Sequence, residues 1–235
     1  MKFSGIDGCK SGWIVCEINE TEFQFYLLQK IDEILPNINE YKAILIDIPL
    51  GFADKEYRKC DILARKMLKN RRGSIFLLPC EEALKANEYN VACRINEKIM
   101  GKKFSKQVWN IRKKILEVND FVRKYWLQGK IRESHPEICL MALNNNLPCK
   151  YSKRTKEGIE ERIKILSKYL SLDKAKIFYQ YNKRLLNFDD LLDAIALAIN
   201  ARNYKNFKRI PPDSDIDKYG IEREIVFSID SLHLL

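Results

Sequence analysis

Four aspartates stand in runs of apolar residues, where a charged side chain is costly. Asp7 ends the strand-like run KFSGID, and Asp47 follows the strand-like run YKAILI. Asp190 and Asp193 lie three residues apart in NFDDLLDAIALAIN, so on a helix they share one face. A charge in such a place loses solvation and persists only where a positive or hydrogen-bonding partner meets it. The pattern therefore predicts that these acids share a partner.

Hard divalent cations are the partners that suit converging carboxylates. Mg²⁺ and Mn²⁺ prefer oxygen ligands, and the carboxyl ends of buried strands are where ligands gather in open α/β sheets. Two such ions about 3.5–4 Å apart activate a water and stabilise the leaving oxygen of a phosphodiester. We expect Asp7, Asp47 and Asp193 to be the metal ligands and Asp190 to complete the site.

A simpler interpretation stays open for part of this group. Asn187 would cap the last helix, and the helix dipole would favour Asp189 and Asp190 in its first turn. That interpretation does not account for Asp193, which lies in the second turn among apolar neighbours.

Other catalytic motifs fit less well. GIDGCKSG contains a Lys-Ser pair, but Cys9 stands where a Walker A loop needs glycine, and the stretch is not G-x-G-x-x-G. A cysteine nucleophile would be Cys9 or Cys139 beside His135, without any supporting signature. These cysteines are expected in the core.

Length and composition set the broad class. The chain has 235 residues, enough for one substantial domain, and 42 Lys+Arg against 32 Asp+Glu give a formal charge of +10. Such an excess attracts polyanions such as nucleic acid, although a compositional bias would produce the same number. The seven cysteines form no C-x-x-C pair, which argues against a zinc knuckle or a disulfide framework. No run reaches the roughly 18 apolar residues of a membrane span, so we expect a cytoplasmic protein with no membrane partner.

The elements that must position the acids follow an α/β order with a mixed sheet. Apolar or branched runs predict strands, and charged segments with helical periodicity predict helices. The predicted strands cover residues 2–7, 13–18, 23–28, 41–49 and 130–134, with a further edge strand in 221–229. Helices are expected in 31–41, through much of 52–129, after Pro136, and in 153–170 and 187–205.

Eight stretches in the same order resemble one known family. They are GIDGCKSGW, IDIPLGF, RKCDILARK, RRGSIFLLP, SKQVWNI with KILEVND, ESHPEICLMALN, SKRTKEGIEER and DDLLDAIALA. The family is the predicted-nuclease family catalogued as domain of unknown function 429, with a ribonuclease H-like fold. The resemblance implies a mixed five-stranded sheet flanked by helices, with the first three strands antiparallel. It also implies one domain over 1–235, with residues 52–129 as a helical insertion between the fourth and fifth strands.

The resemblance also implies roles for individual residues. Metal-binding acids in resolvase-like members of this fold come from the first strand, the fourth strand and the closing helix, which here are Asp7, Asp47, Asp190 and Asp193. Glu133 is implied as an additional catalytic acid. His135 is a candidate proton carrier, with the alternative that it only begins a helix and bonds to local backbone.

The helical insertion would then act as a substrate clamp. Arginine grips phosphate through two hydrogen bonds and tryptophan stacks on bases. The alternative is that these charged runs are simply solvated helix faces. The candidate substrate-binding residues are Arg71, Arg72, Ser74, Lys106 and, before the helix that starts near Thr155, Lys153; Gln107, Trp109 and Arg154 are further candidates.

These expectations add up to a Mg²⁺- or Mn²⁺-dependent nuclease acting on DNA or RNA. One rival is a non-catalytic module that keeps the fold and binds nucleic acid or protein. A second rival is an actin-like phosphohydrolase or kinase, which needs a second glycine-rich phosphate loop. Gly158 stands alone in the latter half of the chain, so this rival is ranked last.

Overall fold

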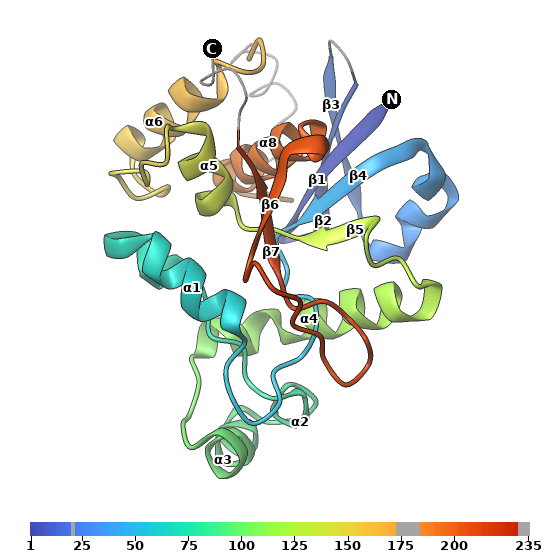
Figure 1. Cartoon of the computed structure of the whole chain (residues 1–235), viewed down its shortest axis with the longest axis vertical. Coiled ribbons are helices and arrows are strands. Elements are labelled where there is room, and N and C mark those ends of the chain that lie inside the picture. The colour runs from blue at the N-terminus through green and yellow to red at the C-terminus, as the bar shows by residue number, and fades with distance from the viewer. Residues whose placement is uncertain (20–21, 173–183, 230–235) are drawn as a thin grey trace. The chain divides into compact units, whose positions relative to one another are not determined.

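A mixed five-stranded sheet forms the centre of one part of the protein (Figure 1). The computed structural model describes residues 1–19, 22–172 and 184–229. The strands stand in the order β3-β2-β1-β4-β5, antiparallel from β3 to β1 and parallel from β1 through β4 to β5. They are β1 Lys2–Cys9, β2 Gly12–Ile18, β3 Phe23–Leu28, β4 Tyr41–Ile46 and β5 Ile131–Glu133. The predicted α/β class and the mixed sheet are confirmed.

The chain divides into two compact units. The described residues among 1–47, 129–208 and 226–235 form the first unit, and residues 48–128 and 209–225 form the second. The helical stretch expected between the fourth and fifth strands lies between β4 and β5, as predicted. The interpretation of the whole chain as a single domain with an insertion at 52–129 stays a prediction.

The first strand is two residues longer than expected. Its parallel ladder with β4 ends at Ile6 and Ile46, but its antiparallel ladder with β2 continues to Cys9 and Gly12. Gly12 has a φ of 137°, a backbone conformation that side chains disfavour, so glycine suits this end of the hairpin. Asp7 therefore lies just beyond the parallel pairing while still held by the hairpin.

The helices of the first unit gather beside the sheet (Figure 1). α8 packs against β1, β2 and β4, and it also contacts α5 and α6. Nearly all its side chains are buried, as the apolar pattern predicted. The segment expected as a short helix at 31–41 is a 3-10 helix that contains Pro36, which lacks the N–H that an α-helix interior needs. The bounds are η1 Ile31–Glu40, α5 Pro136–Leu143, α6 Lys156–Leu166, α8 Phe188–Arg202 and η3 Tyr204–Asn206.

A glycine in β1 lets α8 come close to the sheet. A Cβ on Gly5 would lie 2.2 Å from the carbonyl oxygen of Ala194 and 2.4 Å from the amide nitrogen of Ala198. No side chain fits in that space, so the sequence places glycine on the strand and alanines on the helix. The closeness of this contact fixes the position of α8 over β1.

The second unit is mainly helical. Within it, the side-chain amide of Asn119 holds the loop after β4, because its Oδ1 accepts from the amide of Gly51 at 2.8 Å and its Nδ2 donates to the carbonyl of Pro49 at 2.8 Å. Across both units, no helix in the described ranges is both long and apolar enough to cross a membrane. The helices are α1 Lys59–Met67, η2 Lys69–Ser74, α2 Glu81–Leu84, α3 Tyr89–Met100 and α4 Lys106–Tyr125.

The strand expected in 221–229 does not extend the central sheet. β7 (Ile225–Ser228) instead pairs with β6 (Phe207–Ile210) in a separate two-stranded sheet, and the unit boundary falls within both strands. All four residues of β7 are buried, a pattern unlike that of a solvent-facing edge strand. The carbonyl of Val226 accepts a hydrogen bond from the Ser134 hydroxyl at 2.6 Å.

The seven cysteines are all buried free thiols, as the absence of paired spacing predicted. They are core residues of both units.

Candidate active site

Asp7 and Asp47 lie next to each other on neighbouring parallel strands. The amide of Asp47 donates to the carbonyl of Ile6 at 2.9 Å, which is the last hydrogen bond of the parallel pairing, so Asp47 directly follows the end of β4. Adjacent strands are about 4.8 Å apart. Asp7 is 7% exposed and its Oδ1 accepts from the amide of Gly8 at 2.6 Å, whereas Asp47 is half-buried. The two predicted ligands at the strand ends are therefore neighbours.

The close packing of α8 brings its acids to the same place. Side chains two residues apart on a strand share a face, so Asp7 projects on the face of β1 where Gly5 meets the helix. Asp193 precedes Ala194, the residue against which Gly5 packs, and Asp193 is 2% exposed. Asp7, Asp47 and Asp193 therefore all belong to the part of the first unit where α8 packs on β1 and β4, and their role as shared ligands stays a prediction.

The electrostatics of Asp7 reflect this crowding. Burial raises the pKa of Asp7 well above its ordinary value, and the negative charges of Asp47, Asp193 and Asp190 raise it further, against the opposing effect of Lys153. Burial likewise raises the pKa of Asp193 to about 6, although Lys153 counteracts it. The ionised carboxylates of this group therefore repel one another, and the ammonium of Lys153 opposes that repulsion.

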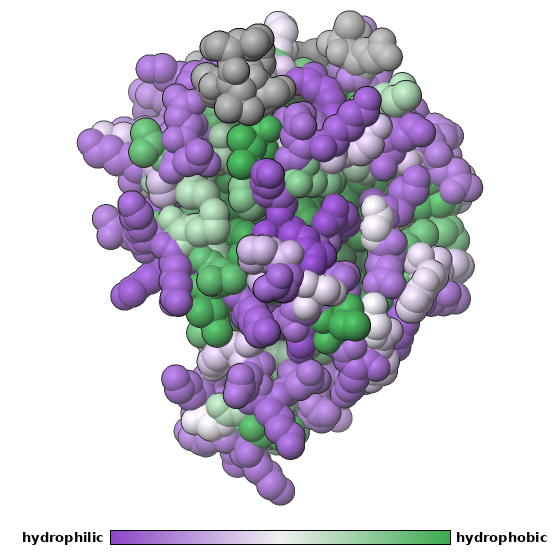
Figure 2. Space-filling model, in the orientation of Figure 1, coloured by the Kyte–Doolittle hydropathy of each residue, from purple (hydrophilic) through white to green (hydrophobic). Residues whose placement is uncertain are grey.

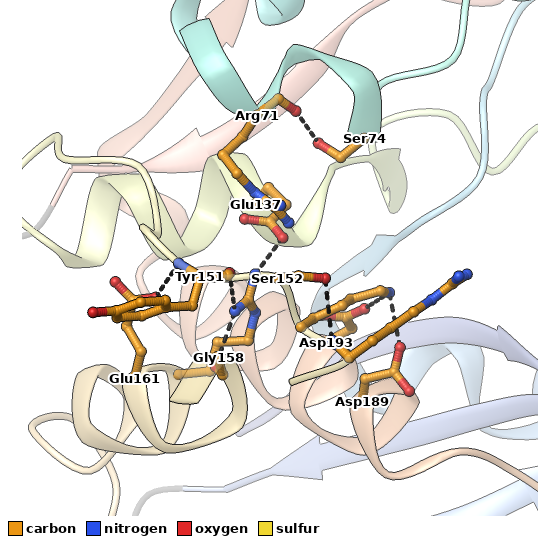
Figure 3. A network of polar contacts seen from close by, with 12 residues as sticks. Arg71, Ser74, Glu137, Tyr151, Ser152, Gly158, Glu161, Asp189 and Asp193 are labelled. Atoms are coloured by element: carbon orange, nitrogen blue, oxygen red, sulfur yellow. Dashed lines mark hydrogen bonds and ion pairs between the residues drawn. The ribbon is translucent and has the colours of Figure 1, made fainter. Parts of the chain in front are cut away.

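Lys153 pairs with the acid that α8 contributes. Its Nζ lies 2.5 Å from Oδ2 of Asp193 and 3.4 Å from Oδ2 of Asp189 (Figure 3). Burial lowers the pKa of Lys153, but the charges of Asp193 and Asp7 outweigh it and raise the pKa above its usual range. The residue expected to meet a substrate anion thus meets a predicted metal ligand instead.

The segment before α6 is tightly held. Thr155 is the N-cap of α6, and its hydroxyl accepts from the amide of Gly158 at 3.1 Å. A Cβ on Gly158 would lie 1.8 Å from the carbonyl oxygen of Ser152, so only glycine lets the first turn lie against this segment. Gly158, which stood alone in the sequence, shapes this turn.

A buried ion pair was missed by sequence reasoning. The guanidinium of Arg162 on α6 binds the carboxylate of Glu137 on α5, and both are buried. Arg162 also donates to the carbonyl of Gly158 at 2.9 Å and to that of Tyr151 at 3.2 Å (Figure 3). It therefore orients the backbone two residues before Lys153. The pair joins helices 25 residues apart, and no local pattern marks it.

Asp190 closes the start of α8. Its Oδ2 accepts from the amide of Asn187 at 2.7 Å, as in a capping box. Burial raises the pKa of Asp190. The helix-cap interpretation therefore describes this acid, while Asp193 lies beyond it as expected.

Glu133 and His135 follow the next strand along. Glu133 ends β5 opposite Ile46 of β4 and is buried. His135 is the N-cap of α5, and its Nδ1 accepts from the amide of Glu137 at 3.1 Å. This bond matches the local-backbone alternative for His135 and leaves its role as a proton carrier a prediction.

The substrate-binding candidates of the helical stretch all lie in the second unit. Arg71, Arg72 and Ser74 belong to the 3-10 helix η2, and the Ser74 hydroxyl donates to the carbonyl of Arg71 at 2.8 Å (Figure 3). Lys106 is the exposed first residue of α4. The acids and Lys153 belong to the first unit, and these candidates belong to the second.

Cysteine chemistry finds no support at this site. Cys139 is fully buried, and burial raises the pKa of its thiol to about 12. A nucleophilic cysteine needs a lowered pKa. Cys139 is instead a core residue whose Sγ lies 3.1 Å from the Ser134 hydroxyl.

The donor set suits a divalent metal ion in chemistry and in charge. All the side chains offer carboxylate oxygens, which Mg²⁺ and Mn²⁺ prefer, and their like charges are only partly balanced by Lys153. Within the described ranges, no three of these acids have oxygens within 4.8 Å of one another. A shared ion thus requires rotations of the carboxylates, and it would share Asp193 with Lys153.

Comparisons with known proteins return one family. No curated protein and no solved structure matches the chain. Residues 5–215 match the sequence model of a family described as protein of unknown function (DUF429).

Proposed function

The chain belongs to the DUF429 family, and we propose that this member is a Mg²⁺- or Mn²⁺-dependent phosphodiester hydrolase acting on DNA or RNA. The observation that carries the proposal is that Asp7 on β1, Asp47 directly after β4 and Asp193 on α8 lie close enough for their charges to act on one another. The sheet order 3-2-1-4-5, with its first three strands antiparallel, supports a ribonuclease H-like fold.

In this proposal Asp7, Asp47 and Asp193 hold the cation, and Glu133 or Asp190 completes the acidic site. A bound cation would polarise the phosphate and lower the pKa of a water molecule. The burial of Asp7 and Asp193 excludes solvent and so strengthens their interaction with the ion.

Two further side chains have roles in the proposed hydrolysis. Lys153, when it leaves Asp193, would meet a phosphate oxygen, which is the role predicted from the sequence. A proton moved by His135 would pass through Nε2, because Nδ1 accepts from the amide of Glu137.

The rival is a module that binds nucleic acid or protein without hydrolysis. The observation that favours it is the ion pair between Lys153 and Asp193, because an internal ammonium can balance a buried carboxylate without any metal. The two proposals differ in whether the acidic group takes up divalent ions.

Purified protein incubated with Mg²⁺ or Mn²⁺ and single- or double-stranded DNA or RNA tests the hydrolase. We expect cleavage products that disappear in EDTA, and a loss of rate of about 10²-fold or more in Asp7→Asn or Asp193→Asn, the scale of removing one electrostatic stabiliser of a transition state. Asp32→Asn, an exposed acid of η1, is the matched control and should keep full activity. Full activity of Asp7→Asn, or calorimetry without heat from either metal, would contradict the proposal.

A further inference from the structure

Two half-buried aromatic rings, one from the start of α3 and one from the start of α4, lie together in the second unit. The rings of Tyr89 and Trp109 are 5.9 Å apart between centroids and tilted by 54°. Large aromatic side chains left partly in water often mark a binding surface.

Cationic side chains accompany both rings. The guanidinium carbon of Arg112 lies 3.5 Å from the centroid of the Trp109 ring, and Nη1 of Arg112 donates to the carbonyl of Trp109 at 3.1 Å. Nζ of Lys106 lies 5.9 Å from the centroid of the Tyr89 ring. The indole and the guanidinium therefore form a stacked pair, a geometry that arginine favours.

The aromatic platform, formed by Tyr89, Trp109 and Arg112, is held by contacts within the second unit. The hydroxyl of Tyr89 donates to the carbonyl of Phe104 at 2.7 Å, and the two rings meet edge to face at 5.8 Å. Val108 and Ile115, on the same helix as Trp109, are buried. A rigid platform loses little conformational entropy on binding.

The surrounding sequence is basic without interruption. Residues 98–116 contain seven lysines and arginines and no aspartate or glutamate, in a chain whose whole excess is ten. Figure 2 shows mainly hydrophilic side chains where α3 lies, at the bottom of the view. The seven basic residues of the segment 98–116 are Lys98, Lys102, Lys103, Lys106, Arg112, Lys113 and Lys114.

We propose that Tyr89, Lys106, Trp109 and Arg112 bind a single-stranded polynucleotide. An unpaired base stacks on the Trp109–Arg112 pair or on Tyr89, and the lysines around them meet the phosphates. Stacking needs a base with an open face, which a single strand offers and a duplex covers, and it tolerates any sequence. The basic charge supplies attraction that depends on salt.

This inference narrows the substrate of the proposed hydrolase from any nucleic acid to a single strand. The binding serves that substrate, so in this respect the inference rests on the proposed function. Binding, however, needs neither the acids nor a metal. It can therefore be measured in EDTA, where hydrolysis is absent, so that a failure of one proposal is told apart from a failure of the other.

The experiment measures fluorescence anisotropy of labelled oligo-dT, oligo-rU and a duplex with the full chain in EDTA. We expect the single strands to bind more tightly than the duplex, with affinity that falls as salt rises. Trp109→Ala should weaken binding about 5- to 150-fold, the range for the loss of one base–aromatic stack. Trp109→Phe should retain most of the affinity.

Trp126→Ala is the matched control. Trp126 belongs to the same unit and is 62% exposed, yet it lies outside the basic segment. Its replacement should leave affinity within about twofold, and circular dichroism should show that both alanine variants are folded. Preference for the duplex, equal losses in the two alanine variants, or no binding of single strands would overturn the proposal.

Discussion

Without metal, the ammonium of Lys153 neutralises part of the charge of the acidic group through its ion pair with Asp193. Its ammonium lies 2.5 Å from an oxygen of Asp193, and Arg162 holds the carbonyl of Tyr151 nearby. A cation that binds Asp193 must share this carboxylate with the lysine, whose positive charge repels it. Lysine and metal are therefore expected to compete for Asp193.

Replacing Lys153 by glutamine should tighten metal binding. The ammonium no longer competes, and a partly exposed ion pair contributes about 0.5–1 kcal/mol, so the dissociation constant for Mn²⁺ should fall about two- to fivefold. Titration calorimetry in the absence of nucleic acid measures the change. Lys156→Gln, at the exposed first position of α6, is the control. Weaker binding in Lys153→Gln would show that the lysine supports the metal instead.

Asp7→Asn should stabilise the metal-free protein at neutral pH. Folding raises the pKa of Asp7, so between its unfolded and folded pKa values the folded state holds a proton that the unfolded state releases. Stability therefore falls as pH rises through that interval, and the loss persists above it. The variant lacks this titration, while asparagine keeps an oxygen for the amide of Gly8.

Thermal unfolding in EDTA from pH 4 to 8 measures the effect. The melting temperature of Asp7→Asn should exceed that of the wild type at pH 8, by about 2–4 °C for each kcal/mol, and match it at pH 4. Asp32→Asn should follow the wild type throughout. A lower melting temperature of Asp7→Asn at pH 8 would mean that the charge of Asp7 is already stabilised without metal.

The buried positions of Asp7 and Asp193 were predictable, because an apolar run surrounds each of them. Asp7, Asp47 and Asp193 contradict their local pattern, and this contradiction was the signal. The partners were not predictable, because Lys153 and Asp193 are 40 residues apart, and Arg162 and Glu137 are 25 apart. Ion pairs of that kind depend on tertiary packing alone.

At the scale of elements, the contact of β1 with α8 positions the acids of α8 beside Asp7. Gly5→Ala would place a Cβ against the backbone of Ala194 and Ala198, which cannot move as a flexible side chain does. We expect a loss of stability of about 1–3 kcal/mol or more, the cost of overpacking, together with weaker Mn²⁺ binding because α8 shifts away.

Urea unfolding and calorimetry check this expectation. Gly73→Ala is the matched control, since a Cβ there meets nothing within 4 Å and its φ is not positive. It should be neutral or slightly stabilising. If Gly5→Ala were equally neutral, the helix would not be held by this contact.

Elements with strong patterns were predicted well, and those that depend on partners were not. The apolar strands and the packed helix α8 follow from their own residues. The extension of β1 to Cys9 depends on pairing with β2, and the place of β7 beside β6 depends on burial of all four residues. Neither partner is visible in the local sequence.

At the scale of the molecule, the composition of the second unit shows how far sequence order can mislead. Residues 209–225 join a unit formed mainly by residues 48–128. Oδ2 of Asp217 accepts from the amide of Phe52 at 3.0 Å, and the hydroxyl of Tyr219 donates to Glu81 at 2.9 Å. Contacts across more than 130 residues made this membership unpredictable, although the helical stretch itself was expected.

The buried cysteines give each unit its own chemical reporter. Cys9, Cys16, Cys139 and Cys149 belong to the first unit, and Cys60, Cys80 and Cys93 belong to the second. An alkylating reagent reaches a covered sulfur only after the surrounding core opens. The pattern of modified peptides over time thus records separately how often the core of each unit opens, without any engineered label.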